Sequence, residues 1–268
     1  MRSLWKGAIS FGLVNIPISL YAATERKDTK FTYLHEACMT PVKYVKFCPN
    51  CNREVPMEEI VRGYAYDRGQ FVVMREEDFD ALPLPTTRSI EIIDFVSLAE
   101  IDPIYFDKTY FLEPTQGGLK AYALLRRAMA DSGRIALAKV AIRAKESLAA
   151  VRVYDGQALA METMFYPDEI RSYAGLAGVI APEPRVAEQE LAMAGMLIAN
   201  LSTPFEPGKY QSDYRHALRE LIRARIEGEE VVRPALPEPE KVADLMEALR
   251  ASLAMVERQA TDGPVQLQ

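Results

Sequence analysis

The amino-acid sequence predicts a β-rich α+β fold followed by a helical arm. Before about residue 180, short runs of β-branched and aromatic residues alternate between turn residues, which is typical of strands. Beyond the proline-containing stretch at residues 181–184, apolar residues recur at the spacing of amphipathic helices. We therefore expect a β-rich domain over residues 1–180, a helical dimerisation arm over 181–232 and an acidic segment over 233–268.

The first strands are expected within residues 4–21. Apolar side chains alternate there in two phases, first at Ile9, Phe11 and Leu13 and then at Ile16, Ile18 and Leu20. A one-residue shift turns every side chain to the opposite face of a sheet, so the change of phase at Val14 and Asn15 predicts a bulge or a tight turn. Pro17 cannot donate a hydrogen bond to a neighbouring strand, which favours an edge strand or the start of one.

Further strands are expected up to about residue 114. The runs rich in β-branched and aromatic residues are 30–34, 42–47, 60–66, 70–74, 89–95 and 108–112. Asp67, Arg68 and Gly69 separate two of these runs and predict a hairpin turn. Residues 76–82 have the composition of one short helix.

The second half of the chain changes from strand to helix. A helix is expected over 119–129, then strand over 134–153, a turn at Asp155 and Gly156, and strand over 158–165. Helical stripes of apolar residues follow at 191–201, 214–222 and 242–256. Gly228 is the expected stop of the second of these helices, because glycine readily adopts the left-handed conformation that ends a helix.

Composition and motifs restrict the function classes. No apolar run approaches the roughly 20 residues of a membrane span and no signal-peptide pattern opens the chain, so we expect a cytoplasmic protein with no membrane partner. The sequence has no phosphate-binding loop, no nucleophile elbow and no dinucleotide-binding fingerprint. With two histidines in the chain, one of them in a candidate metal site, we do not expect an enzyme.

The three cysteines and one histidine lie close together in the sequence. His35, Cys38, Cys48 and Cys51 form the pattern H-x2-C-x9-C-x2-C, and two such short knuckles can place four ligands tetrahedrally around zinc. Four protein ligands leave no position for a catalytic water, so the predicted role of the zinc is structural. The alternative is that Cys48 and Cys51 are reduced structural thiols and His35 is a surface residue.

Positive charge gathers in two regions, although the formal net charge of the chain is −6. Binding to an anionic partner follows local patches more than whole-chain charge. The first region holds Arg26, Lys27, Lys30, Lys43, Lys46 and Arg53 against Asp28 and Glu36, and the second holds Arg134, Lys139, Arg143, Lys145 and Arg152 against Glu146. Six cations against two acids, and five against one, leave each region with a local balance of +4.

These cations, Arg152 excepted, are the candidate DNA contacts. Lys139, Arg143 and Lys145 occupy odd positions while Val140 and Ile142 occupy even ones, so a strand here would carry a row of cations opposite an apolar face. Such a row can follow phosphates and reads no bases. The alternative is that both regions are ordinary solvated strand faces.

Several segments resemble the core domain of bacterial Ku, the DNA-end-binding protein of non-homologous end joining. They are residues 4–17 (LWKGAISFGLVNIP), 108–114 (KTYFLEP), 122–125 (YALL), 133–139 (GRIALAK) and 205–210 (FEPGKY), with Asp213 and Tyr214. The resemblance covers nearly the whole chain, and together these segments are highly specific.

The resemblance implies a Ku-core β-barrel with an insertion after its first strands, which forms a bridge over DNA and here holds a zinc-ribbon-like loop at residues 35–51. It implies a ring-shaped homodimer that threads onto double-stranded DNA ends through backbone contacts, and a nucleoid-associated place in the cytoplasm. It also implies recruitment of a multifunctional DNA ligase through the C-terminal part. Many bacterial Ku proteins end in a Lys-rich extension, whereas residues 227–268 hold four Lys or Arg against nine Asp or Glu, so we expect no additional DNA binding by this tail.

Two other function classes stay open on the residues alone. A zinc-ribbon module that binds a protein partner and no DNA would have no affinity for duplex ends. A hydrolase would need a catalytic constellation that the sequence does not offer.

Overall fold

A computed structural model describes residues 1–81, 88–142, 145–181, 184–228 and 245–262 of the chain. The chain divides into two compact units, Met1–Ser172 and Tyr173–Gln268. Each unit is described by itself below.

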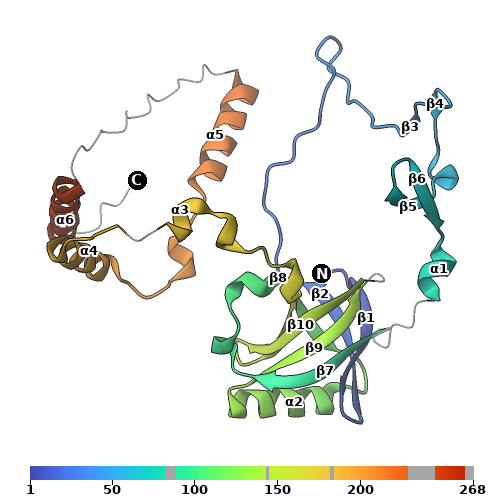
Figure 1. The fold of residues 1–268 in the computed structure, drawn as a ribbon, viewed down its shortest axis with the longest axis horizontal. Coiled ribbons are helices and arrows are strands. Elements are labelled where there is room, and N and C mark those ends of the chain that lie inside the picture. The colour runs from blue at the N-terminus through green and yellow to red at the C-terminus, as the bar shows by residue number, and fades with distance from the viewer. Residues whose placement is uncertain (82–87, 143–144, 182–183, 229–244, 263–268) are drawn as a thin grey trace. The chain divides into compact units, whose positions relative to one another are not determined.

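Seven strands of the first unit close into a barrel in the order β1-β2-β8-β11-β10-β9-β7 (Figure 1). Their bounds are β1 (Trp5–Phe11), β2 (Val14–Ala22), β7 (Ser89–Val96), β8 (Phe106–Pro114), β9 (Ile135–Ile142), β10 (Lys145–Tyr154) and β11 (Ala158–Met164). All neighbouring strands are antiparallel except β1 and β7, which are parallel and close the barrel. The barrel confirms the β-rich fold that the alternating runs predict.

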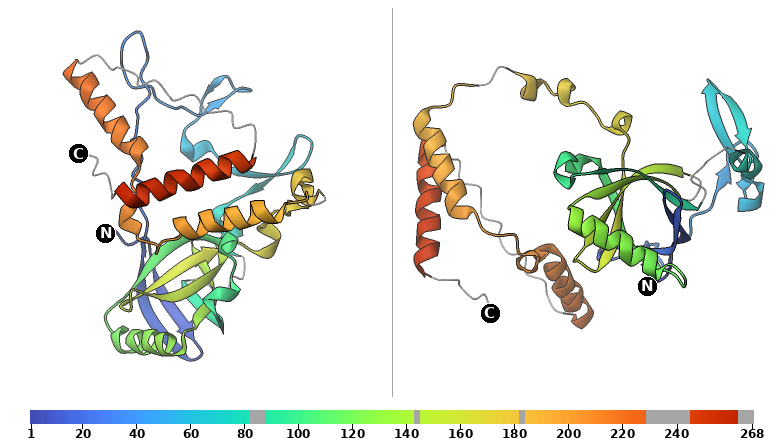
Figure 2. Two further views of the ribbon diagram at one scale, coloured as in Figure 1. Left: turned by 90° about the vertical axis from the view of Figure 1, so that its left-hand side faces the viewer. Right: turned by 90° about the horizontal axis from the view of Figure 1, so that it is seen from below.

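The barrel core consists of aliphatic side chains from every strand. Ile9, Ile18, Leu20, Ile90 and Met161 are at most 1% exposed, and the helix α2 (Leu119–Ser132) packs Tyr122, Leu125 and Met129 against the same cluster. Two views show α2 lying along one end of the barrel (Figures 1 and 2). Gly133 ends α2 with φ of 62°, a left-handed conformation that glycine adopts without strain.

Tyr122 ties this helix to two neighbouring strands. Its buried hydroxyl donates a hydrogen bond of 2.8 Å to the carbonyl of Leu112 in β8 and accepts one of 2.7 Å from the N–H of Leu159 in β11. Leu112 and Leu159 are directly paired in the sheet, so the hydroxyl satisfies two backbone groups that the barrel buries. Burial raises the pKa of Tyr122, which keeps this hydroxyl protonated.

The opening strands form a hairpin whose turn lies slightly earlier than the sequence indicates. Phe11 pairs with Val14, and the turn is made by Gly12, with φ of 57°, and Leu13. Of the two alternatives for Pro17, the edge strand is wrong, because β2 lies between β1 and β8 in a closed barrel. Pro17 does lie near the start of β2, one residue before the β2–β8 ladder begins at Ile18. The carbonyl of Pro17 faces β8 and accepts a hydrogen bond from the N–H of Thr115. Because the paired residues of β2 and β8 end at Ile18 and Pro114, the N–H that Pro17 lacks would have had no partner in β8.

Residues 134–153 form two strands, β9 and β10, that pair antiparallel from Lys145 opposite Ile142 onward. Asp155 and Gly156, with φ of 49° and 65°, form the predicted turn before β11.

The described residues between β2 and β7 form short elements. They are β3 (Phe47–Cys48), β4 (Arg53–Glu54), the 3-10 helix η1 (Met57–Glu59), β5 (Arg62–Asp67), β6 (Gln70–Met74) and α1 (Glu76–Asp80). The β5–β6 hairpin confirms the strands expected over 60–66 and 70–74. The strands expected over 30–34 and 42–47 are absent from these described residues apart from a bridge between Leu34 and Pro41 and the start of β3, because no apolar neighbour covers their side chains.

Short 3-10 helices link the remaining elements: η2 (Leu98–Glu100), η3 (Pro103–Tyr105), η4 (Pro167–Glu169), η5 (Tyr173–Gly175) and η6 (Pro207–Lys209). The second unit is helical, with α3 (Ala177–Ile180), α4 (Glu188–Leu201), α5 (Asp213–Glu227) and α6 (Leu245–Asp262). The helices α4 and α6 pack against each other (Figure 2). Gly228, with φ of 76°, ends α5 as expected. None of the described helices combines the length and the apolar character that a membrane crossing requires.

The role of Tyr122 can be tested by Tyr122→Phe, which keeps the ring and removes the hydroxyl. Two buried backbone groups then lose a partner, and we expect the free energy of unfolding to fall by about 1–3 kcal/mol. Tyr154→Phe is the matched control, because the Tyr154 side chain is 46% exposed on the barrel surface, and it should change stability by less than about 0.5 kcal/mol. Denaturant unfolding of both variants measures this, and equal effects would contradict the proposed tie.

Candidate nucleic-acid interface

One candidate DNA contact lies beside a basic residue that the sequence reasoning missed. Arg26, just after β2, and Lys108 in β8 line the same cavity of about 760 Å³. Thr24, Thr109 and Ser147 line the same cavity, and so do the acidic residues Glu25 and Asp107. Lys108 is not among the predicted contacts. Its Nζ lies 3.8 Å from the carboxylate of its neighbour Asp107, and the pairing of β2 with β8 brings it near the exit of β2.

Several of the predicted cations are engaged by acidic or other neighbours. Lys27 pairs with Glu25 and Arg53 pairs with Glu59. The remaining contacts of this kind are longer or uncharged: Lys139 Nζ lies 3.9 Å from Glu146 Oε1, and Lys46 Nζ lies 2.7 Å from the Met57 sulfur. All four cationic side chains remain accessible, so these contacts weaken the local positive potential without burying it.

Three other candidates are exposed and do not gather at one place. Lys30 and Lys43 lie in the segment between β2 and β7, whereas Arg134 follows α2 and lines a different, apolar groove. Within the described part of the chain, neither Lys43 nor Arg134 has an ion-pair partner. Arg26 and Lys108 thus line one cavity, and Arg134 lines another.

The row of cations expected along one strand does not form. β9 ends at Ile142 and β10 begins at Lys145, so Lys139 and Lys145 belong to different strands of a hairpin. Arg143 and the side chain of Lys145 lie outside the described residues. Arg152, the remaining cation of this region, makes a 2.7 Å ion pair with the buried carboxylate of Glu162 in β11 and is thereby held on the barrel.

The predicted zinc ligands form two separate pairs. His35 Nδ1 lies 3.1 Å from Cys38 Sγ, and Cys48 and Cys51 interact with each other at the start and end of a tight turn beside β3. Among the described residues no three His, Cys, Asp or Glu side chains meet as a metal site would require. The donor set suits zinc, while the present geometry supplies two half-sites.

Hydrogen bonding already favours thiolate at two of these cysteines. Contacts with Thr40 lower the pKa of the Cys38 thiol, and hydrogen bonds from the backbone N–H and side chain of Cys51 lower the pKa of Cys48. The same hydrogen bond raises the pKa of Cys51 because its thiol is the donor. Thiolates are the form that ligates a metal.

Comparison with known proteins shows the family of this chain. Residues 10–193 match the family model of the Ku70/Ku80 beta-barrel domain. The chain is 56% identical over 260 residues to the "Non-homologous end joining protein Ku" of Symbiobacterium thermophilum, covering 97% of this chain and 64% of that protein. It is 52% identical over 260 residues to the protein of the same name from Heliobacterium modesticaldum, covering 97% and 94%. The chain belongs to the Ku family. A Bacillus subtilis Ku is 45% identical over 267 residues, covering 98% of this chain and 85% of that protein.

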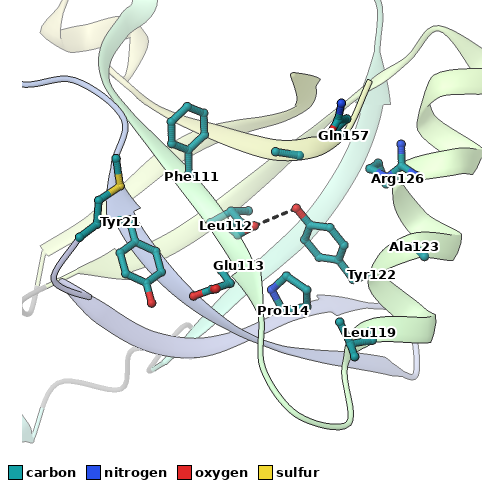
Figure 3. Close-up of a pocket in the computed structure, with 12 residues that line it drawn as sticks. Tyr21, Phe111, Leu112, Glu113, Pro114, Leu119, Tyr122, Ala123, Arg126 and Gln157 are labelled. Carbon is teal, nitrogen blue, oxygen red and sulfur yellow. Dashed lines mark hydrogen bonds between the residues drawn. The ribbon is translucent and has the colours of Figure 1, made fainter. Parts of the chain in front are cut away.

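This Ku-family barrel carries a second cavity of about 700 Å³ on its outside, between β2, β8 and α2 (Figure 3). Its charged groups have structural partners: Glu113 is hydrogen-bonded to Tyr21, which raises the pKa of Tyr21, and the Arg126 guanidinium donates to the carbonyl of Gly156. Glu113 and Arg126 therefore hold a strand and a turn in place, and the cavity adds no cation to the candidate DNA contacts.

Proposed function

We propose that this protein binds double-stranded DNA ends without sequence preference, as a ring-shaped homodimer that acts in non-homologous end joining, protects the ends and recruits a DNA ligase. The single observation that carries the proposal is the match to Ku proteins over almost the whole chain. The closed barrel with a long segment inserted between β2 and β7 supports it, because such a segment can reach around a duplex while both of its ends stay fixed.

Uncovered apolar surfaces support the homodimer. The β5–β6 hairpin exposes side chains on both faces, including Tyr64, Phe71 and Val73. An isolated hairpin is marginally stable in water, so a partner that covers it would supply the missing core. The helix α5 likewise has no buried residue, and Tyr214 and Ile226 are 74% and 81% exposed. A second copy of the chain is the simplest partner for such faces.

Backbone contacts would give the sequence-independent binding. Arg26 and Lys108 share one cavity wall, and Lys43 is exposed without an ion-pair partner among the described residues. Cations of this kind attract phosphates and carry no base information. The Arg134, Lys139, Arg143 and Lys145 group is proposed as a second set of contacts on the resemblance and the charge balance alone.

Ligase recruitment is proposed for the C-terminal segment, residues 233–268, by its place in the chain and its resemblance to the family. This segment contains α6, whose side chains from Leu245 to Val256 are described and of which Leu249 and Leu253 are half-buried. A zinc-ribbon module that binds protein and no DNA is the second candidate, and the pairing of Lys27 and Arg53 with carboxylates favours it.

A structural zinc ion is proposed at His35, Cys38, Cys48 and Cys51. These residues would hold it if the two half-sites approach, and the ion would then join the two parts of a loop that buries no apolar side chain of its own. Its contribution would be to the shape of the inserted segment.

Charge reversal in the inserted segment tests the phosphate contacts. For Arg26→Glu with Lys43→Glu we expect weaker binding to every duplex sequence, and a plot of log K against log salt whose slope falls by about one per lost contact. Lys120→Glu with Arg127→Glu is the control, because these two cations of α2 are exposed and are not among the candidate contacts. Fluorescence anisotropy with several duplexes at two or more salt concentrations measures both the affinity for each sequence and its salt dependence. A changed sequence preference would contradict contacts to the backbone, and no binding of the unmodified protein would favour the protein-interaction module.

Threading is tested by DNA topology. A basic patch binds phosphates anywhere, so linear and circular duplexes of equal length should compete equally for it. A closed ring must admit an end, and we expect nicked circles to compete poorly although they offer the same phosphates. Competition between linear and nicked circular forms of one plasmid at moderate salt measures the difference. Equal competition would rule out threading and leave a basic patch.

Metal content tests the zinc site. We expect about one zinc per chain by elemental analysis, since one set of four ligands binds one ion. Cys48→Ser should lower the zinc content and make residues 35–51 more sensitive to proteolysis, with less effect on unfolding of the barrel. Asn50→Ser lies in the same turn, ligates nothing and should leave the zinc content unchanged. A metal-free protein purified without chelator would overturn the site.

A further inference from the structure

The inserted segment between β2 and β7 changes the sign of its charge half-way. Residues 23–53 hold six Lys or Arg against three Asp or Glu, whereas residues 54–80 hold three Arg against eight Asp or Glu. The candidate DNA contacts of this segment all lie in the first half. Phosphates repel the second half, which contains η1, the β5–β6 hairpin and α1, so its surface fits a partner other than DNA.

Acidic residues gather at one end of the β5–β6 hairpin. The pairing of β5 with β6 brings η1, which precedes β5, and α1, which follows β6, to the same end. Glu59 and Glu76 are held there in ion pairs within this chain. Glu58 and Glu77 are exposed, and in the described part of the chain neither has an ion-pair partner. These two residues, here named the acidic end, carry negative charge that a cationic partner can meet.

One face of the hairpin is apolar and uncovered. Phe71 and Val73 share this face with the small residues Ala65 and Gly63, their partners across the ladder. Phe71 is 64% exposed and Val73 is 49% exposed. The opposite face carries the cation Arg62. An exposed apolar surface next to a charged rim is typical of an interaction site.

The helix α5 has the opposite charge along one edge and no buried residue. Arg215 and Arg219, here named the arginine edge, are four residues apart and therefore lie on one side of the helix. Neither has an ion-pair partner among the residues that the structure describes. Tyr214 and Leu221 belong to the apolar stripe beside this edge and are 74% and 39% exposed. The acids of α5 are seven residues apart and lie on a different edge: Asp213, Glu220 and Glu227.

The other described helices fit the hairpin less well. α1, α3 and α4 contain no Lys or Arg. α2 carries cations, but its apolar stripe is already buried against the barrel. α6 packs against α4, and its two Arg are outnumbered by three Asp or Glu. The cations of residues 26–53 are the proposed phosphate contacts, so α5 is the described helix that matches the hairpin in both charge and apolar surface.

We propose that α5 of one copy of the chain lies on the apolar face of the β5–β6 hairpin of a second copy, with its arginine edge against the acidic end. Two-fold symmetry makes this contact twice, once from each copy. The apolar contact covers a hairpin that is marginally stable alone, and the charges fix which edge of α5 meets the acidic end. This inference rests on the proposed homodimer and adds the two surfaces that form it.

Charge reversal followed by mixing tests this contact with the full-length protein and no DNA. The first variant carries Glu58→Arg with Glu77→Arg, and the second carries Arg215→Glu with Arg219→Glu. Each variant alone sets like charges against each other in both contacts, so we expect the dissociation constant of its dimer to rise about tenfold. An equal mixture should recover dimers with one copy of each variant, because both contacts then join opposite charges. Sedimentation equilibrium of each variant and native mass spectrometry of the mixture measure this.

Recovery on mixing also separates a contact between copies from one within a chain, because a chain that folds onto itself keeps its own mismatch. Glu220→Arg is the matched control on another edge of α5 and should change the dissociation constant by less than about twofold. Phe71→Ala should weaken the dimer about fivefold or more, and Tyr64→Ala on the opposite face should not.

The outcomes distinguish this contact from the homodimer itself. Unmodified protein that is monomeric at micromolar concentration would overturn the homodimer and the contact with it. A dimer that both charge reversals leave unchanged, or a mixture that recovers no mixed dimer, would overturn the contact alone. Equal weakening by Phe71→Ala and Tyr64→Ala would also overturn it, because the hairpin would then not use one face.

Discussion

The first unit depends on one short parallel pairing that closes the barrel. Ala8, Ile9 and Ser10 of β1 lie opposite Ser89, Ile90 and Glu91 of β7, and the N–H of Ala8 donates a 3.0 Å hydrogen bond to the carbonyl of Arg88. Gly7 permits this approach, because a Cβ at that position would collide with the Trp5 ring and with the Arg88 carbonyl. A backbone carbonyl cannot rotate away as a side chain can, so a side chain at Gly7 would force the two strands apart.

This closure fixes both ends of the inserted segment. Trp5 pairs with Leu20, so β2 ends beside the beginning of β1, and β7 starts beside Ala8 on the other side of the same strand. The segment between Ala22 and Ser89 thus leaves and re-enters the barrel at one end, separated by one strand. Its described residues have almost no core of their own, so we expect its shape to depend on the proposed metal, DNA or second chain that covers it.

An element of this fold can be predicted from the sequence when it depends on nearby residues, and cannot when it depends on pairing with a distant segment. The strands β6, β7 and β11 and the end of α5 at Gly228 follow from local alternation and turn residues, and the sequence predicts them within a residue or two. The alternation cannot tell an edge strand from an inner strand of a closed barrel, which is why the edge-strand alternative for Pro17 is wrong. It also cannot reveal the hairpin between β9 and β10, which places Lys139 and Lys145 on different strands. The runs at 30–34 and 42–47 have the composition of strands, but a run becomes a strand only where another strand pairs with it, and these runs have little such pairing. The approach of Lys108 to Arg26 depends on the β2–β8 pairing, which local sequence does not encode.

Local ion pairs also affect how this chain, with a formal net charge of −6, would bind the phosphates of DNA. Lys27 and Arg53 are paired, but the pairs are exposed, with side chains between 47% and 74% accessible, and ion pairs on the surface contribute little to stability. In the proposed DNA complex, a phosphate would therefore displace the carboxylates of Glu25 and Glu59 at little cost, and the pairing would lower the affinity without removing the site.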